Sequence, residues 1–379
     1  DSVASRGLGD VYKRQERARQ RYVLKCWTNY GLKAEMNNQR TVRVELGERS
    51  YNVVIGSGVR KQIAQLVPAT AKRAIVITQA TIPYSVEEDL VNVGISVRTI
   101  NIGLGEEFKS IATFEEIMRE CASFGLTRND VIVGVGGGMV TDIAGFAASA
   151  WHRGIAVVHV ATTLVGMVDA AIGGKTGVNL PDGKNLVGAF WQPRGVLCDI
   201  DALASLSHRE TRCGNGEMAK YHFLTGDDLL GLDLVDRIAR CVEIKADIVG
   251  SDEREGGRRM LLNYGHTLAH AIEIATEYSI AHGEAVAIGL VYAAHLAREL
   301  GRITEERVAQ HRLVVEGEYG LSCSLPHGIH HDELIALMHG DKKALTGLTF
   351  VLDGPRGVEP VTAVSVDAVR SALNRMEVR

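Results

Sequence analysis

The sequence predicts an α/β N-terminal domain with a Rossmann-like doubly wound sheet over residues 36–203, followed by an all-α domain over 204–379. Short β-branched runs separated by helix-like segments continue to about residue 200 and are typical of a parallel sheet. The apolar periodicity then changes to that of helices. Ligands are expected between the two halves.

The segment TVRVELGERSYNVVIGSG (41–58) alternates apolar and polar residues on either side of Gly47 and predicts a hairpin. Further strands are expected at 74–78, 95–102, 131–136, 156–163 and 195–200, with a helix at 111–124. Helices are expected in the second half at 227–250, 257–277, 283–300, 303–319, 331–339 and 367–376.

Composition and charge exclude several classes of protein. The net charge of −4 gives no reason to expect nucleic acid or an anionic membrane as a partner. The six cysteines form no CxxC pair and predict reduced thiols in a cytoplasmic protein. No apolar run approaches the roughly 20 residues that span a bilayer.

The first 35 residues show no apolar period, and the stretch DVYKRQ within them matches the translation of a common sequencing adapter. We expect residues 1–35 to be a non-native leader, with Met36 as the true start. No apolar core of a signal peptide follows them.

Three consecutive glycines, Gly136, Gly137 and Gly138, end a buried strand in VIVGVGGGMVTDIAGFAA (131–148). Such a turn lets the backbone approach a pyrophosphate, which the helix N-terminus favours. A plain strand-to-helix turn would give the same pattern, and the spacing is not GxGxxG. Thr162 and Thr163 end the next strand and could donate to phosphate.

The segment GGKTGVNLPDGKNLVGAFWQP (173–193) has few secondary-structure signals and carries Lys175, Lys184 and Asn185. It is either a surface loop with solvated lysines or a loop that binds phosphate and hydroxyl groups. Arg153 is another candidate for binding an anionic ligand.

The segment LLNYGHTLAHAIE (261–273) places histidines where a helix would have core residues. Arg259, Asn263, His266 and His270 follow steps of four, three and four, which predicts one polar stripe on a continuous helix. A lone histidine on an apolar helix would be a hydrogen-bonded core residue, but four polar groups on one stripe favour a ligand-binding site. The zincin motif HExxH is missing, since Thr267 follows His266, so the sequence does not support the mechanism of a zincin protease.

These motifs together resemble the 3-dehydroquinate synthase family of sugar-phosphate cyclases, from about Met36 to Phe350. The matching blocks are GEEFKS, GGGMVTDIAGFAA, VDAAIGGKTGVNLPDGKNLVGAF, LLNYGHTLAHAIE and HGEAVAIG. Gln79 departs from the family, where an acidic residue or Asn is common. GNGEMAKYHF is less apolar than usual, although Glu217 and Lys220 keep their places.

The resemblance implies a dehydroquinate synthase-like fold, NAD, and zinc or cobalt held by Glu217, His266 and His282. It implies an NAD site at Glu106, Lys109, Gly136, Gly137, Gly138, Asp142, Thr162 and Thr163. It implies substrate contacts at Arg153, Asp169, Lys175, Lys184, Asn185, Lys220, Lys245, Arg259, Asn263, His270 and Lys342 or Lys343. Among these, the residues expected to act in catalysis are Lys175, Lys220, Asn185 and His270.

The implied reaction converts 3-deoxy-D-arabino-heptulosonate 7-phosphate to 3-dehydroquinate and phosphate, a step of the shikimate pathway. A transient NAD-dependent oxidation permits phosphate elimination, and reduction, ring opening and aldol closure follow. The family also implies a homodimer in which Arg153 reaches the site of the other subunit. The alternatives are a cyclase for a non-carboxylated sugar phosphate and a metal-dependent polyol dehydrogenase.

Overall fold

A twisted seven-stranded sheet organises the first half of the chain. The computed structural model describes residues 39–340 and 348–378. The sheet has the order β1-β2-β9-β6-β5-β3-β4. Its strands are β1 (Arg40–Val44), β2 (Tyr51–Gly56), β3 (Arg73–Thr78), β4 (Ser96–Asn101), β5 (Val131–Gly136), β6 (Ala156–Ala161) and β9 (Gly195–Asp199). Only β1 and β2 pair antiparallel within it, so the predicted hairpin and parallel strands are confirmed.

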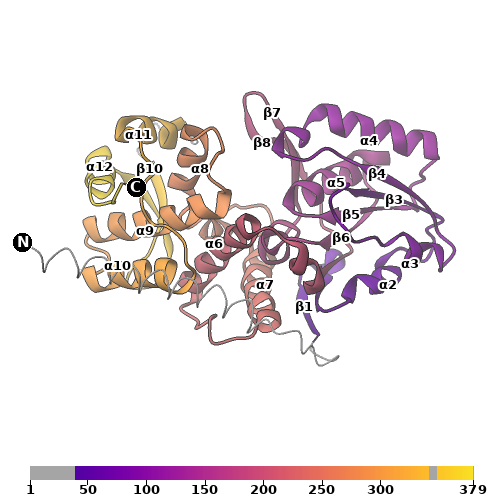
Figure 1. Ribbon diagram of the computed structural model, residues 1–379, viewed down its shortest axis with the longest axis horizontal. Helices are drawn as coiled ribbons and strands as arrows, with labels where there is room; N and C mark the ends of the chain where they lie inside the picture. The colour runs from indigo at the N-terminus through magenta and orange to yellow at the C-terminus, as the bar shows by residue number, and fades with distance from the viewer. Residues whose placement is uncertain (1–38, 341–347, 379) are drawn as a thin grey trace, which may run out of the picture. The chain divides into compact units, whose positions relative to one another are not determined.

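Helices cover both faces of this sheet (Figure 1). Helices α2 (Ile63–Leu66) and α3 (Glu87–Val91) bury Ile63 and Leu90 on one face. Helices α4 (Ile111–Phe124) and α5 (Gly138–Ala150) pack on the other. Helix α4 has the predicted bounds because Ser110 caps its first turn and Gly125, with φ +67°, ends it. Strand β5 is buried throughout, as expected of a central parallel strand.

The segment expected to be a loop at 173–193 is instead a second, two-stranded sheet. Strands β7 (Lys175–Leu180) and β8 (Gly183–Phe190) pair antiparallel. Gly177 and Gly188 face each other, and a Cβ on Gly188 would lie 2.1 Å from the carbonyl oxygen of Thr176. The loop prediction was wrong because glycines that read as a turn signal here permit close strand pairing.

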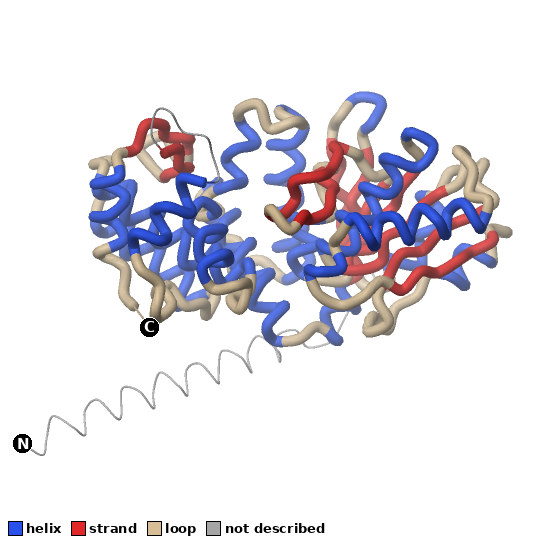
Figure 2. The backbone as a smooth tube through the Cα atoms, turned by 90° about the horizontal axis from the view of Figure 1, so that it is seen from above, coloured by secondary structure: helices blue, strands red, loops and turns tan. Residues whose placement is uncertain are grey.

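The second half is mainly helical (Figure 2). Its helices are α6 (His208–Thr225), α7 (Leu234–Ser251), α8 (His266–Ala275), α9 (His282–Glu299), α10 (Glu305–Arg312), α11 (His331–Gly340) and α12 (Val366–Leu373). Helix α9 is buried along most of its length and forms the centre of this half. A hairpin of β10 (Leu348–Leu352) and β11 (Glu359–Val364), which the periodicity did not indicate, completes it.

The change from strands to helices falls after β9, near the predicted boundary at 203/204. Residues 39–379 cluster as one compact unit, and the division into two domains stays a prediction. No described helix is long and apolar enough to cross a membrane. The expected start at Met36 and the leader before it lie outside the described residues.

Candidate active site

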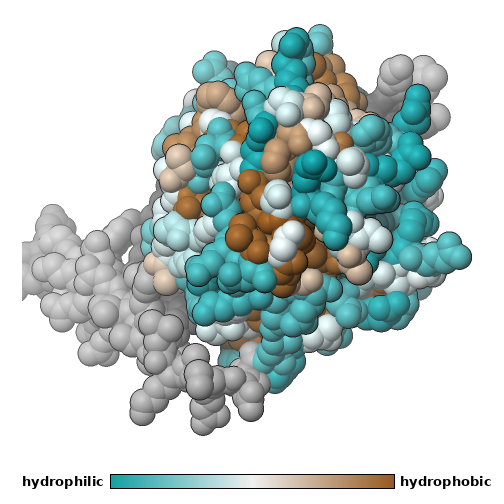
Figure 3. All heavy atoms as spheres, turned by 90° about the vertical axis from the view of Figure 1, so that its right-hand side faces the viewer, coloured by the Kyte–Doolittle hydropathy of each residue, from teal (hydrophilic) through white to brown (hydrophobic). Residues whose placement is uncertain are grey.

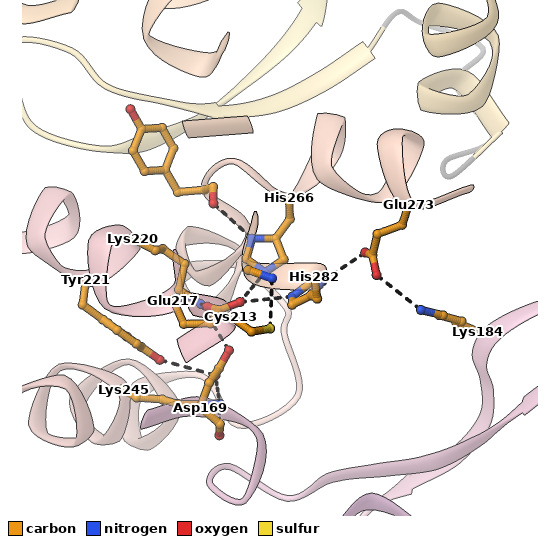
Figure 4. Close-up of polar contacts among 12 residues, drawn as sticks. Asp169, Lys184, Cys213, Glu217, Lys220, Tyr221, Lys245, His266, Glu273 and His282 are labelled. Carbon is orange, nitrogen blue, oxygen red and sulfur yellow. Dashed lines mark hydrogen bonds and ion pairs between the residues drawn. The ribbon is translucent and has the colours of Figure 1, made fainter. Parts of the chain in front are cut away.

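Three helices bring one carboxylate and two imidazoles together (Figure 4). Glu217 lies in the middle of α6, whereas His266 and His282 are the first residues of α8 and α9. Nε2 of His282 lies 3.1 Å from Oε1 of Glu217, and Nε2 of His266 lies 3.5 Å from it. Donor atoms of the three residues lie within 4.8 Å of one another, so the structure brings the predicted metal ligands together.

Glycines allow this close approach of helices. A Cβ on Gly216 would lie 2.0 Å from the carbonyl oxygen of Gly283, and a Cβ on Gly289 would lie 2.0 Å from that of Gly265. The backbone of α6 therefore touches that of α9 next to Glu217 and His282. The N–H of Gly283 also donates to Sγ of Cys213, which ties the first turn of α9 to α6.

The environment of Glu217 suits a cation. The residue is fully buried, and its charge is met by the ammonium of Lys220, which lies 2.6 Å from Oε2. Burial alone would raise its pKa, but the charges of Lys220 and then His266 lower the pKa well below its usual value. A buried carboxylate whose Oε1 faces two imidazoles fits a catalytic metal site with open coordination positions.

The predicted continuous helix over 257–277 was wrong. Residues Arg258–Asn263 form a 3₁₀ turn, and α8 starts only at His266. The break lies at Gly265, whose φ is +78° and whose Cβ would lie 2.9 Å from the backbone nitrogen of Leu290. Arg259, Asn263, His266 and His270 therefore do not share one helical stripe, and long-range packing against α9 decided this.

His270 follows His266 by one turn of α8 and is half-buried. Its ring centroid lies 5.6 Å from that of His266 and 6.1 Å from that of His282. Its donor atom falls in a second group with Glu273 and His282, not in the group around Glu217. The predicted role toward substrate stays a prediction.

Asp169 contacts two of the predicted lysines, Lys220 and Lys245, next to the carboxylate–imidazole group. Its carboxylate accepts from Lys220 at 3.2 Å, from Tyr221 at 3.3 Å and from Lys245, and Lys245 also donates to its carbonyl oxygen at 2.6 Å. Lys220 in turn lies 2.6 Å from Glu217. Burial is the main cause that lowers the pKa of Lys245 to about 8. Burial would raise the pKa of Asp169, but the charges of Lys220 and Lys245 lower it to about 2.

The glycine turn has the shape of an anion cradle. Gly136 ends β5, and α5 starts at Gly138, so the first N–H groups of α5 have no partner within the helix. A Cβ on Gly137 would lie 2.8 Å from Cγ2 of Thr163, and one on Gly138 would lie 2.9 Å from Cβ of Ala170. The chain therefore keeps this turn free of side chains, which fits a dinucleotide pyrophosphate.

Lys109 connects this turn to the β7–β8 hairpin. Its buried Nζ lies 2.5 Å from Oδ2 of Asp142 on α5 and donates at 2.5 Å to Oδ1 of Asn185. The side chain of Asn179 donates to Glu106 at 2.9 Å. The structure thus brings Glu106, Lys109, Asp142 and Asn185 together. Gln79, at the end of β3, donates to the carbonyl oxygen of Gly103 at 2.9 Å.

The lysines of the hairpin form ion pairs with the helical half. Nζ of Lys175 lies 2.6 Å from Glu255, whose other oxygen accepts from Asn263 at 3.0 Å. Nζ of Lys184 lies 3.3 Å from Glu273 and 3.8 Å from the ring centroid of Tyr278. These lysines are therefore paired charges, and the carboxylates of Glu255 and Glu273 already lie beside them.

Two predicted arginines differ in exposure. Arg259 is buried, with 1 % of its surface exposed, and donates to the carbonyl oxygens of Gly173 (2.9 Å) and Glu253. Arg153 is exposed in the 3₁₀ turn Trp151–Arg153 that follows α5, and its predicted contact with substrate stays a prediction. Lys342 and Lys343 lie outside the described residues.

Sequence reasoning missed Glu255, Glu273 and Tyr221. Glu273 is an acidic residue on the apolar face of a histidine-bearing helix, which is a usable signal. Tyr221 directly follows Lys220. Glu255 lies in the charged stretch DEREGGRR, where no pattern distinguishes it from its neighbours.

Family models match most of the chain. The model described as 3-dehydroquinate synthase N-terminal matches residues 99–213, and that described as 3-dehydroquinate synthase C-terminal matches residues 214–344.

Curated relatives extend the similarity over nearly the whole chain. A protein of Amycolatopsis mediterranei (strain S699) named putative aminodehydroquinate synthase is 48 % identical over 337 residues, covering 89 % of this chain and 94 % of the relative. The 3-dehydroquinate synthase of Thermobifida fusca (strain YX) is 43 % identical over 295 residues, covering 72 % and 80 %.

A solved structure shares the fold at lower identity. It is 2-deoxy-scyllo-inosose synthase complexed with carbaglucose-6-phosphate, NAD+ and Co2+. It is 27 % identical with a TM-score of 0.79, and the alignment covers 88 % of this chain and 99 % of that one.

Proposed function

Because this chain belongs to the 3-dehydroquinate synthase family, we propose that it converts 3-deoxy-D-arabino-heptulosonate 7-phosphate to 3-dehydroquinate and inorganic phosphate. The observation that carries the proposal is the convergence of Glu217, His266 and His282 within 4.8 Å. These residues lie beside Lys220 and Asp169, which join the metal ligands to the predicted substrate site.

Glu217, His266 and His282 would hold a divalent metal, zinc or cobalt, and the turn at 136–138 would hold NAD. The related 2-deoxy-scyllo-inosose synthase was crystallised with NAD+ and Co2+, which supports this assignment. When bound, NAD accepts and returns a hydride, and the metal polarises the hydroxyl group that is oxidised.

The remaining residues bind and orient the substrate. Lys175 and Lys184 would bind its phosphate as point charges, and Asn263 and His270 would add hydrogen bonds. The ion pairs that these lysines form with Glu255 and Glu273 would have to yield to the phosphate, or share the lysines with it.

Asp169 holds Lys220 and Lys245 against each other's repulsion and so keeps two ammonium groups in a buried site. Lys245, with a pKa of about 8, can hold or release the proton on Nζ near neutral pH. Lys220 keeps its proton, because Asp169 and Glu217 outweigh burial and raise its pKa. The two lysines therefore differ in pKa although both are buried.

Phosphate release is the direct test of this function. The purified chain should release inorganic phosphate from the heptulosonate phosphate without net accumulation of NADH, and a chelator should stop the release. Stoichiometric NADH would point to a polyol dehydrogenase instead. Release from sedoheptulose 7-phosphate or glucose 6-phosphate, but not from the heptulosonate, would point to the other cyclases.

A homodimer with Arg153 acting in the partner's site is part of the proposal. Arg153 is exposed in the left-handed region (φ 66°), beside His152 (φ 49°), and has no ion-pair partner among residues 39–340 and 348–378. Figure 3 shows a hydrophobic area on one face of the described chain, which favours a protein–protein interface.

Subunit mixing tests this arrangement. Arg153→Ala and Glu217→Gln chains, each inactive alone, should regain up to about a quarter of wild-type activity when unfolded and refolded together. Mixtures that stay inactive would place Arg153 in its own subunit's site, and an Arg153→Ala chain that is active alone would place it outside any site.

The amino-substituted heptulosonate phosphate is a second candidate substrate. The putative aminodehydroquinate synthase of Amycolatopsis mediterranei is 48 % identical to this chain, against 43 % for the Thermobifida fusca 3-dehydroquinate synthase. The two compounds should be compared by kcat/KM under the same conditions. A higher kcat/KM for the amino compound would make it the substrate, with the same residues acting on it.

A further inference from the structure

Each of the two imidazoles beside Glu217 has a partner for its second ring nitrogen, and the two partners differ. Nδ1 of His266 lies 3.0 Å from the backbone carbonyl oxygen of Tyr264. Nδ1 of His282 lies 3.0 Å from Oε2 of Glu273, a side chain on α8. One imidazole is thus held by a neutral peptide group and the other by an ionisable carboxylate.

Glu273 is not a surface residue that happens to be near. It is 5 % exposed, and it lies on a helix whose neighbouring side chains include Ala269, Ala271 and Ile272. A buried carboxylate costs free energy unless hydrogen bonds and opposite charges compensate. Its two oxygens have different partners, since Oε2 faces His282 and Oε1 lies 3.3 Å from Nζ of Lys184 (Figure 4).

Glu273 could instead be a metal ligand, because its donor atom lies within 4.8 Å of those of His270 and His282. The geometry argues against that role. His282 already directs Nε2 at Glu217, and a neutral imidazole has only one nitrogen lone pair for a metal. The ammonium of Lys184 on the other oxygen of Glu273 would also repel a cation there.

We propose that Glu273 is a positioning residue of the metal centre. Its Oε2 accepts a hydrogen bond from Nδ1–H of His282, which selects the tautomer that offers Nε2 to the metal and makes this nitrogen a stronger ligand. Its Oε1 binds Lys184, so the β7–β8 hairpin is connected to a metal ligand through one carboxylate. The inference rests on the metal site of the proposed function.

The two tasks of Glu273 can be separated by mutation. Glu273→Gln keeps the size of the side chain and an oxygen acceptor but removes the charge, and Glu273→Ala removes both. Lys184→Met is the matched control, because at Glu273 it breaks only the contact of Oε1 and leaves the bond to His282; it also removes the ammonium from the Tyr278 ring. A purely structural role in α8 would lower the melting temperature without a selective effect on the metal.

Metal affinity is measured on the full chain by competition with a chromophoric chelator, and the visible spectrum of the Co2+-loaded chain reports ligand geometry. Glu273→Ala should weaken the metal affinity by about 10- to 100-fold and alter the Co2+ spectrum. Glu273→Gln should lie between Ala and wild type. Lys184→Met should keep the wild-type affinity and spectrum but raise the KM of the sugar phosphate.

Wild-type metal affinity and spectrum in both Glu273 variants would overturn the positioning role alone. Two metal ions per wild-type chain, with one lost in Glu273→Ala, would overturn it by making Glu273 a ligand. A wild-type chain that binds no divalent metal would overturn the proposed metal site and the positioning role together, so the two failures are distinguishable.

Discussion

Replacing Gly216 by alanine tests whether the contact between α6 and α9 sets the geometry of the candidate metal centre. The new Cβ would lie 2.0 Å from the carbonyl oxygen of Gly283, whereas real Cβ contacts are not shorter than 3.0 Å. The helices must therefore separate by at least the difference, 3.0 − 2.0 = 1.0 Å. Glu217 and His282, which are the adjacent residues on the two helices, would separate with them.

The expected loss of stability is small, because two effects oppose each other. Overpacking of this kind costs about 3 kcal/mol, whereas alanine is about 1 kcal/mol better than glycine within a helix. The net loss of about 2 kcal/mol lowers the melting temperature by only roughly 2–3 °C in a chain of this size.

The effect on the metal should be much larger. Metal–ligand distances tolerate deviations of only about 0.2 Å, so a shift of about 1 Å should weaken the affinity at least about 10-fold. The assay is chelator competition on the folded variant, with melting recorded in parallel. Gly317→Ala is the control, since that Cβ lies on an exposed helical turn and meets only Cδ1 of Leu313, at 3.3 Å. Wild-type metal affinity in Gly216→Ala would refute the reasoning.

Three further outcomes are expected. Glu217→Gln should lose its metal, whereas His270→Ala should keep it and turn over about 100-fold more slowly; loss of metal in both, measured by elemental analysis, would contradict the ligand assignment. Because the pKa of Lys245 is lowered to about 8, its positive charge is lost as pH rises through that value. The substrate KM should therefore rise roughly tenfold from pH 7 to 9, and Lys245→Met should show no such rise. Glu255→Gln removes the anion beside Lys175 and should strengthen inhibition by inorganic phosphate about fivefold; unchanged inhibition would show that Glu255 does not compete.

Much of the fold could be predicted because its signals are local. Alternation around Gly47, the buried run of β5 and the helical period of 111–124 each depend on residues a few positions apart, and all three elements were confirmed. The break at Gly265 was missed because it depends on a backbone contact with the distant Leu290. The β7–β8 hairpin is local, but its glycines, which permit close strand pairing, read as a turn signal.

The site divides in the same way. The residue types and their spacing indicated Glu217 with Lys220 on one helix, and His282 at the start of another. That Glu273 holds His282, and that Glu255 holds Lys175, could not be predicted, since nothing within a few residues of either carboxylate specifies its partner.

The sequence by itself determined the order of the strands in the main sheet along the chain, the change to helices after them, the glycine turn before α5 and the inventory of groups that can bind a metal, a dinucleotide and a phosphate. The tertiary structure decided which of these groups meet. Glu217 and His282 are brought together because glycine backbones touch where α6 crosses α9, and the partner of each imidazole nitrogen follows from that crossing. Such contacts join residues that are far apart in the sequence, so no short-range pattern of residues predicts them.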